Sequence, residues 1–238
     1  MLMNILITND DGIASPGLWK LAEAAQRYGK VWIVAPDGER SAMSHSYTWR
    51  ESVKIWPVSS MVEGAEAYAC SGTPTDCVRV GALKLLPDKP DVVMAGINSG
   101  FNISHDIQYS ATVGSVLEAA FWNIHAIAFS QGSVEYQDVV DQYLLNIMEE
   151  CLKRPLEKGQ VWNVNFPRCE LSDCKGIRWD CRVSQDPFYV DTYEEESEVD
   201  GKKSLRLVYG RNWNGSEGTD LRAIIENYIS VGKVNNIG

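Results

Sequence analysis

The chain has 238 residues, of which 22 are Lys or Arg and 32 are Asp or Glu, so its formal net charge at pH 7 is −10. With 45% hydrophobic and 23% charged residues it has the composition of an ordinary globular protein, which excludes disordered and collagen-like chains. The acidic balance and the lack of a basic stripe argue against a nucleic-acid polymer as partner, because phosphate chains bind clustered Lys and Arg. The sequence contains no apolar run long enough for a membrane span and no secretory signal. We therefore expect a cytoplasmic protein with no membrane partner.

The six cysteines contain no C-x-x-C pair. Three of them, Cys169, Cys174 and Cys181, lie close together, but no histidine is near enough to complete a familiar zinc pattern. We interpret all six as ordinary thiols of a reducing compartment, with a structural zinc or a disulfide at the three as the alternative.

The first two-thirds of the chain alternates short apolar runs with segments of helical periodicity. Strands are expected at residues 4–8, 31–35, 91–96, 126–129 and 161–165. Helices are expected to begin at Pro16 and Pro74, each after a capping Ser or Thr, and to cover residues 113–121 and 140–151. This alternation predicts an α/β fold with a mainly parallel sheet and helices on both faces.

After Pro167 the pattern becomes β-rich. Residues 177–183 and 205–209 are expected to be strands, and Asp200-Gly201 is a hairpin turn signal. We therefore divide the chain into a core, residues 1–167, and a C-terminal β extension, residues 168–238, that packs on the core or projects from it. A protruding hairpin rich in aromatic residues is a candidate for subunit assembly.

Polar residues follow three of the expected strands. Asp10 and Asp11 come directly after the first strand, Ser41 lies in the loop after the second, and Asn98 follows the strand at 91–96. Because the carboxyl ends of parallel strands meet at one edge of a sheet, these side chains are expected to converge. Carboxylate, hydroxyl and amide oxygens bind hard cations, so we predict one divalent metal ion, Mg²⁺, Mn²⁺ or Ca²⁺. The alternative is a polar turn in which these residues only support the backbone.

A fourth loop suits an anion. Residues 108–112 precede the helix expected near Val113, where free backbone N–H groups and the positive end of the helix dipole lie. Ser110 and Thr112 add hydroxyl donors to this helix start, although an N-cap is the alternative role for either residue. A metal ion together with a helix N-terminus would make the site of an acidic protein locally positive, as binding of a phosphate requires.

The blocks around these residues resemble the SurE family, the stationary-phase survival nucleotidases. They are Asn9–Gly12, Ala35–Asp37 with Ser41, Gly72–Val78, Gly96–Asn102 and Tyr109–Val113, and Gly218–Asp220 resembles the last motif of the family. The resemblance implies a Rossmann-like core with a C-terminal β extension, assembly into a homodimer or homotetramer, and metal-dependent hydrolysis of nucleoside 5′-monophosphates, with 3′-monophosphates as further candidate substrates.

The same resemblance implies roles for individual residues. The metal ligands are Asp10, Asp11, Ser41 and Asn98, and the residues on the side of the substrate phosphate are Asn102, Ser110 and Thr112. We expect a metal-activated water to attack the phosphate, with Asp10 or Asp11 as the catalytic proton acceptor.

Two departures from the family pattern keep a second hypothesis open. Ala111 stands where the family usually has Gly, and a Cβ would interfere if the backbone there needs a positive φ or a very close approach to phosphate. Residues 228–234 lack the usual Thr-Pro-Leu of the family. The alternative is therefore a non-catalytic module that senses a nucleotide or a metal ion, and a third hypothesis is ester hydrolysis through a serine. His45 and His105 lie near the expected site, either as proton-transfer groups or as surface residues of loops.

Overall fold

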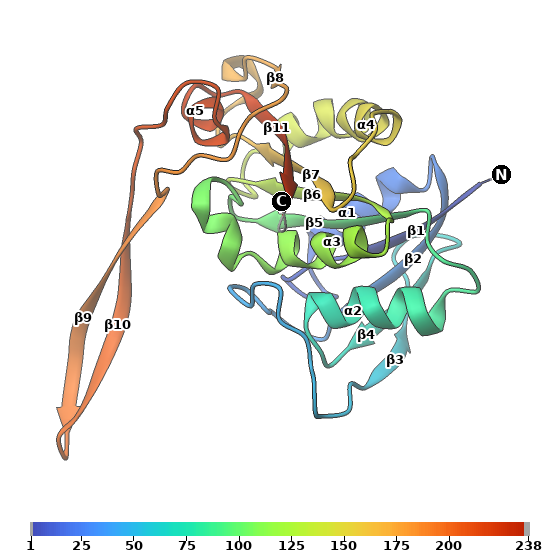
Figure 1. Cartoon of the computed structure of the whole chain (residues 1–238), viewed down its shortest axis with the longest axis horizontal. Coiled ribbons are helices and arrows are strands. Elements are labelled where there is room, and N and C mark those ends of the chain that lie inside the picture. The colour runs from blue at the N-terminus through green and yellow to red at the C-terminus, as the bar shows by residue number, and fades with distance from the viewer. Residues whose placement is uncertain (1, 236–238) are drawn as a thin grey trace.

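Within residues 2–235, which the computed structural model describes, a nine-stranded sheet runs in the order β3-β4-β2-β1-β5-β6-β7-β11-β8 (Figure 1). Its strands are β1 (Met3–Thr8), β2 (Gly29–Pro36), β3 (Ile55–Val58), β4 (Glu66–Cys70), β5 (Val92–Ser99), β6 (His125–Gln131), β7 (Gln160–Phe166), β8 (Ile177–Arg178) and β11 (Ile229–Asn235). Neighbours are parallel from β4 to β7, whereas β3 and β11 run antiparallel to β4 and β7. The predicted mainly parallel sheet is confirmed.

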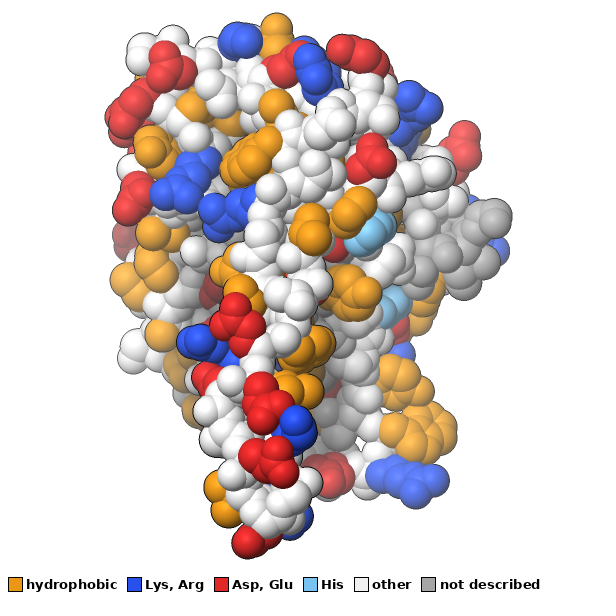
Figure 2. Space-filling view, turned by 90° about the vertical axis from the view of Figure 1, so that its left-hand side faces the viewer, with side chains coloured by type: hydrophobic (Ala, Val, Ile, Leu, Met, Phe, Trp, Pro, Cys, Tyr) orange, Lys and Arg blue, Asp and Glu red, His pale blue; other side chains and the backbone are white. Residues whose placement is uncertain are grey.

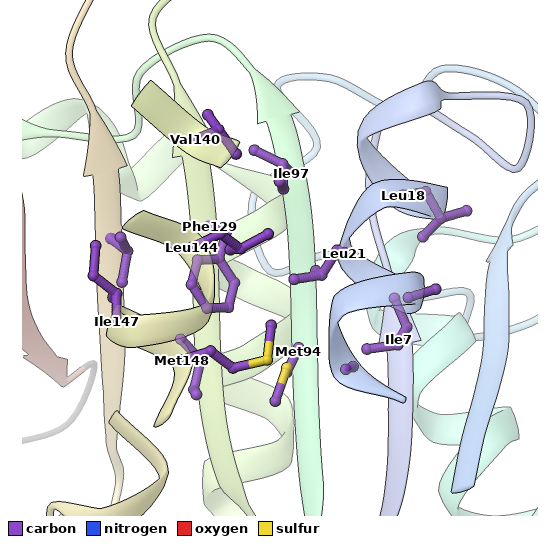
Figure 3. Close-up of a cluster of buried hydrophobic side chains, with 14 of the residues drawn as sticks. Ile7, Leu18, Leu21, Met94, Ile97, Phe129, Val140, Leu144, Ile147 and Met148 are labelled. Atoms are coloured by element: carbon purple, nitrogen blue, oxygen red, sulfur yellow. The ribbon is translucent and has the colours of Figure 1, made fainter. Parts of the chain in front are cut away.

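Helices cover both faces of this sheet. They are α1 (Pro16–Ala25) and α4 (Gln137–Lys153) on one face, and α2 (Pro74–Val80), the π-helical turn η1 (Gly81–Leu85) and α3 (Ala111–Phe121) on the other. Figure 3 shows the first of the two resulting cores, in which Phe129 of β6 lies beside Leu144 of α4, and Leu21 of α1 points toward β5. Each such buried side chain contributes about 1.5–3 kcal/mol, so the helices hold the sheet and its edges in place.

Both predicted helix starts at a proline are present. α2 begins with a capping box: the Thr73 hydroxyl accepts from the Asp76 N–H, and the Asp76 carboxylate accepts from the Thr73 N–H. α1 begins at Pro16, and its next residue is packed against the sheet so closely that a Cβ on Gly17 would lie 2.2 Å from the Ile97 carbonyl oxygen. Glycine at this position therefore allows α1 to approach β5 just before Asn98.

The sequence pattern does not reveal three strands of the main sheet, β3, β4 and β11, and it makes β8 too long. β3 and β4 carry weak β signals, and Pro57 in β3 is tolerated because β3 is the edge strand. The strand predicted at 177–183 ends at Arg178, since Asp180 has a left-handed backbone (φ 58°) that a strand does not accommodate. Beyond it only Arg182 makes an isolated bridge, to Thr219.

The predicted hairpin is present and projects from the core (Figure 1). It consists of β9 (Tyr189–Val199) and β10 (Lys202–Arg211), which contains the strand predicted at 205–209. Its turn residues Asp200 and Gly201 have φ of 51° and 70°, as the turn signal indicates. By contrast, β8 and β11 extend the main sheet, and the short helix α5 (Asp220–Ile225) lies between the hairpin and β11.

The division of the chain at residue 167 stays a prediction, and residues 236–238 of the predicted extension lie outside the described residues. Two 3₁₀ turns complete the chain, η2 (Ser104–Tyr109) and η3 (Leu171–Asp173). In the part of the chain that the structure describes, every helix is too short or too polar to cross a bilayer.

The close approach of α1 to β5 can be tested by adding one methyl group. Gly17→Ala is expected to lower the free energy of unfolding by about 1–3 kcal/mol, because the helix must move away from the Ile97 carbonyl. Urea denaturation measures the change. Gly210→Ala in the hairpin is the control, since its Cβ would meet nothing nearer than the Val190 carbonyl oxygen at 3.9 Å. Equal stability of the two variants would contradict the tight packing.

Candidate functional site

Three loops meet around Asp10 and Asp11 at the carboxyl edge of the sheet. The loop after β2 is joined to Asp10, whose carbonyl oxygen accepts from the Arg40 N–H at 2.7 Å. The loop after β5 is joined to Asp11, whose Oδ2 accepts from the Ser99 N–H at 3.1 Å. Gly12 permits the turn between them, with φ of 94° and so little room that a Cβ would lie 2.9 Å from the Gly38 carbonyl carbon. These contacts bring the three loops together, and the convergence of the side chains of Asp10, Asp11, Ser41 and Asn98 on one site stays a prediction.

Helix α3 also reaches this point. Thr112, in its first turn, donates its hydroxyl to Asp10 Oδ1 at 2.5 Å. Ser110 is the N-cap of α3, because its Oγ accepts from the Val113 N–H at 3.0 Å. The two hydroxyls thus have different roles. Ser110 caps the helix, which is the alternative interpretation of this residue, and Thr112 connects the helix start to the first carboxylate.

Within the part of the chain that the structure describes, the two carboxylates lack a cationic partner. Asp10 is only 3% exposed, and burial raises its pKa to about 6, against the lowering effect of the Thr112 hydroxyl and with a further increase from the charge of Asp11. Burial also raises the pKa of Asp11, helped by the charge of Glu39 although the Ser99 N–H opposes it. Among residues 2–235 neither carboxylate forms an ion pair, and the nearby Arg40 pairs instead with Asp37 at 2.6 Å. Two adjacent, poorly compensated carboxylates are the feature that a bound cation would stabilise.

The predicted ligand set fits a hard cation in its chemistry, although its members are not equally placed. Asn98 is buried next to Ser99, and its Nδ2 donates to the Gly100 carbonyl at 3.0 Å, so its amide oxygen is the atom suited to a cation. Ser41 is exposed, and its hydroxyl donates to Glu39 Oε1 at 3.0 Å. Within the described residues no three His, Cys, Asp or Glu side chains gather as a metal site. A cation here would therefore depend on two carboxylates and neutral oxygens, the donor set that suits Mg²⁺, Mn²⁺ or Ca²⁺.

Asn102 lies in the loop that carries Asn98 and Ser99, but its surroundings are not evident from the sequence. Its side-chain Nδ2 donates to Ser130 Oγ at 2.7 Å, and its backbone N–H donates to Asn165 Oδ1 at 2.8 Å. Sequence reasoning missed Ser130 and Asn165 because both lie within apolar strands. The signal that could have found them is the alternation of Asn163 and Asn165 with apolar residues in the strand predicted at 161–165.

Comparison with known proteins identifies the family of this chain. Residues 5–188 match the family described as Survival protein SurE. The chain belongs to the SurE family. Two relatives named 5′-nucleotidase SurE support the assignment, one from Clostridium botulinum (strain Langeland), 39% identical over 233 residues (96% of this chain and 91% of the relative), and one from Thermoanaerobacter sp., 37% identical over 235 residues (96% and 90%).

The fold agrees as well. The crystal structure of the SurE protein from Aquifex aeolicus matches with a TM-score of 0.82 and 31% identity, covering 99% of this chain and 94% of that one. The resemblance stated from the sequence motifs is therefore confirmed, and so is the α/β class with a separate antiparallel hairpin.

Neither candidate histidine of this SurE protein hydrogen-bonds to Asp10 or Asp11 in the described residues. His45 Nε2 lies 2.9 Å from Glu118 Oε2, and its ring stacks on Phe121. Arg79 binds the other oxygen of Glu118 at 2.5 Å, so the group fastens α2 and the loop after β2 to α3. His105 lies 3.2 Å from Asp106 Oδ1 at the surface. Both histidines therefore have the surroundings of loop and packing residues.

The departure from the SurE motif at Ala111 leaves the backbone relaxed. Ala111 is the first residue of α3 and is fully buried, and its φ is not positive. The conformational strain that a Cβ would cause at a glycine-requiring position therefore does not arise here.

The buried carboxylate should destabilise the metal-free protein at neutral pH. Because the pKa of Asp10 is raised on folding, its contribution to stability is full below about pH 4 and is lost as the pH rises through about 6. Asp10→Asn is therefore expected to be the more stable protein in chelator at pH 8, by up to about 3 kcal/mol, since a tenfold change in acid dissociation corresponds to about 1.4 kcal/mol. Below pH 4 the difference should vanish.

Urea unfolding in EDTA between pH 4 and pH 8 measures this difference. Asp37→Asn, at an exposed carboxylate of the neighbouring loop, is the control and should change the stability by less than about 1 kcal/mol. An Asp10→Asn variant that is less stable than the unchanged protein at every pH would show that the carboxylate is well satisfied by the protein alone.

Proposed function

We propose that the protein is a divalent-metal-dependent 5′-nucleotidase that hydrolyses nucleoside 5′-monophosphates to nucleoside and phosphate, with 3′-monophosphates as further candidate substrates. As a homologue of the 5′-nucleotidases SurE over 96% of its length, it is an enzyme of the phosphomonoesterase class. The observation that carries the proposal is the buried pair Asp10 and Asp11, which lies where three loops and the start of α3 meet. This pair offers a cation site next to a helix N-terminus that suits a phosphate.

One metal ion per subunit would be held by Asp10, Asp11, Asn98 and Ser41. When bound, a divalent ion acts as a Lewis acid toward the phosphoryl group and lowers the pKa of a coordinated water. The protein orients both carboxylates for this role, since the Thr112 hydroxyl fixes Asp10 Oδ1 and the Ser99 N–H fixes Asp11 Oδ2. One oxygen of each carboxylate is thus held in place by the protein.

The residues of the chain have separate roles in the reaction. A water attacks phosphorus, and the bond from phosphorus to the ester oxygen breaks. That oxygen takes up the proton that the water gave to the carboxylate and leaves as the nucleoside hydroxyl. Asp10 or Asp11 accepts the proton of the water. Asn102, Ser110 and the N-terminus of α3 would stabilise the charge on the phosphoryl oxygens, whereas Thr112, predicted on the phosphate side, donates its hydroxyl to Asp10.

The non-catalytic sensor has little support from the structure. One reason for this hypothesis is Ala111, because a strained backbone at this residue would weaken the phosphate site. The backbone there is helical and unstrained. A close approach of phosphate to Ala111, the second reason given for this residue, still supports the alternative. So do the altered residues 228–234, which lie in β11 and directly before it.

Metal-dependent turnover is tested by phosphate release from a panel of nucleoside 5′- and 3′-monophosphates with Mn²⁺, Mg²⁺ or Ca²⁺. We expect release from 5′-monophosphates that EDTA abolishes and added metal restores. Asp10→Asn and Asp11→Asn should each lower kcat by at least about 100-fold, because each removes a charge from the reacting centre.

Asp37→Asn is the matched control and should keep the activity. Mn²⁺ should also raise the Tm of the unchanged protein and not that of Asp10→Asn, which reports binding without turnover. Nucleotide binding without release under any metal would favour the sensor, and undiminished activity of Asp10→Asn in chelator would favour a serine-dependent esterase.

We also infer assembly into a homodimer or homotetramer through the hairpin. The cross-strand pairs of β9 and β10 place Tyr193 opposite Leu207, with Tyr209 and Leu205 on the same face of the hairpin, and all four are exposed. Figure 2 shows hydrophobic and charged side chains next to each other along the projecting segment. Asp191 and Glu195 lie on the same face, opposite Tyr209 and Leu205. A two-stranded hairpin is at best marginally stable alone, so four exposed apolar side chains on one face support contact with a second subunit.

Substitution of the apolar face should change the oligomeric state. Leu207→Asp is expected to shift the molar mass measured by light scattering toward the monomer, because a charge would enter the interface. Val190→Asp, at a similarly exposed residue on the opposite face of the hairpin, should leave the mass unchanged. A monomeric unchanged protein, or equal effects of the two variants, would contradict assembly through this face.

The substrate is further proposed to be a small nucleotide and not a nucleic-acid polymer, supported by the net charge of −10. A cytoplasmic location is proposed from the sequence and remains a prediction.

A further inference from the structure

A row of buried polar side chains crosses the strands beside the candidate site. Asn98 of β5 is in register with Ser130 of β6, Ser130 with Asn165 of β7, and Asn165 with Ser230 of β11. Ser130, Asn165 and Ser230 are at most 1% exposed. Side chains in register on neighbouring strands lie on the same face of a sheet, so this row runs from the predicted metal ligand Asn98 away across the sheet.

The middle of the row holds one loop residue, Asn102, from three directions. Asn165 accepts the Asn102 N–H through Oδ1 at 2.8 Å and donates Nδ2 to the Asn102 carbonyl at 3.0 Å. Asn163 donates Nδ2 to the same carbonyl at 2.8 Å. Ser130 accepts the side-chain Nδ2 of Asn102 at 2.7 Å. Two strands thus satisfy the backbone and the side chain of Asn102, which is buried and needs such partners.

These contacts hold the start of the loop, whereas its later residues are fixed elsewhere: Phe101 and Ile103 pack against Phe188, and the Ser104 N–H donates to Asp220 Oδ2 at 2.9 Å. Gly100, with φ of 154°, lies between Ser99, which contacts Asp11, and Asn102. The Gly100 N–H donates to the Gln131 carbonyl at 2.9 Å, next to Ser130 in β6. The segment from Gly100 to Asn102 is therefore held by the ends of β6 and β7.

We propose that Ser130, Asn163 and Asn165 are positioning residues of the phosphohydrolase site, which act by fixing Asn102 toward the substrate phosphate. Ser130 sets the orientation of the Asn102 amide, and the two asparagines set the place of its backbone. The inference rests on the proposed function, in which Asn102 lies on the phosphate side. The competing explanation is that the row only satisfies buried polar groups and stabilises the fold.

A double-mutant cycle separates the two explanations. Ser130→Ala, Asn102→Ala and the double variant are compared for kcat and KM with a nucleoside 5′-monophosphate and Mn²⁺, and for unfolding in urea. We expect Ser130→Ala to lower kcat by about 10-fold, as is usual for residues that orient a functional group. The double variant should be no less active than Asn102→Ala, because Ser130 acts through Asn102.

Two further variants guard against effects on folding. Asn165→Asp keeps the size and the acceptor for the Asn102 N–H but loses the donor to its carbonyl, and it should lower kcat in the same way. Ser230→Ala is the matched control: it is an equally buried serine of the same row, its hydroxyl interacts with Cys181, and it should keep kcat unchanged.

The outcomes distinguish this inference from the proposed function. An unchanged protein that releases no phosphate with any metal overturns the proposed function, and this inference with it. An active protein in which Ser130→Ala keeps full kcat, or in which the losses of Ser130→Ala and Asn102→Ala multiply, overturns the positioning role alone. Equal losses in Ser130→Ala and Ser230→Ala would likewise show a general structural effect.

Discussion

The burial of two adjacent carboxylates at the rim of a parallel sheet is the constraint on which the site depends. Asp10 and Asp11 follow β1, a strand in the interior of the sheet, and repel each other in surroundings with little water. The fold surrounds them with hydrogen-bond donors, namely the Thr112 hydroxyl and the Ser99 N–H, but with no ion-pairing cation in the described residues. Such an arrangement is unfavourable without a bound cation, and it therefore favours the binding of a cation at this point.

The surrounding framework brings separate elements to this pair. α1 approaches β5 through Gly17, and the Glu118 group fastens the loop after β2 to α3. β6 and β7 support the loop after β5 through Asn102. Three packing arrangements of different chemistry, a close helix contact, an ion-pair group and an amide network, thus converge on one edge. Accurate placement of this kind is what a reaction governed by electrostatic stabilisation requires.

Much of this was readable in the sequence, for physical reasons. The buried strands and the helices that begin at Pro16 and Pro74 are indicated by apolar periodicity and capping residues. The convergence of the loops followed from the parallel sheet alone. The family was identified from the motif blocks, and the comparisons agree.

The rest depended on contacts that a linear pattern does not contain. β3 is short and lies at the edge of the sheet, so its residues show little alternation. β8 ends before Asp180, whose left-handed backbone is allowed for an Asp but is not predicted by the presence of one. Ser41 is exposed in the structure. The residues around it in the sequence do not indicate whether its side chain is exposed or buried as a metal ligand. The hydrogen bonds between Asn165 and Asn102 could not be predicted either, because the two residues are 63 positions apart in the chain.

The antiparallel pairing of β11 with β7 has a consequence for how the protein matures in the cell. The outer edge of β7 is covered only when residues 229–235 arrive, after β8, the hairpin and α5 have been made. At a synthesis rate of about 5–20 residues per second, the nascent chain carries an uncovered, apolar strand border for several seconds. Such borders invite pairing with foreign strands, so translation of this last third is the period in which the polypeptide is most exposed to aggregation and in which a chaperone would be of greatest benefit.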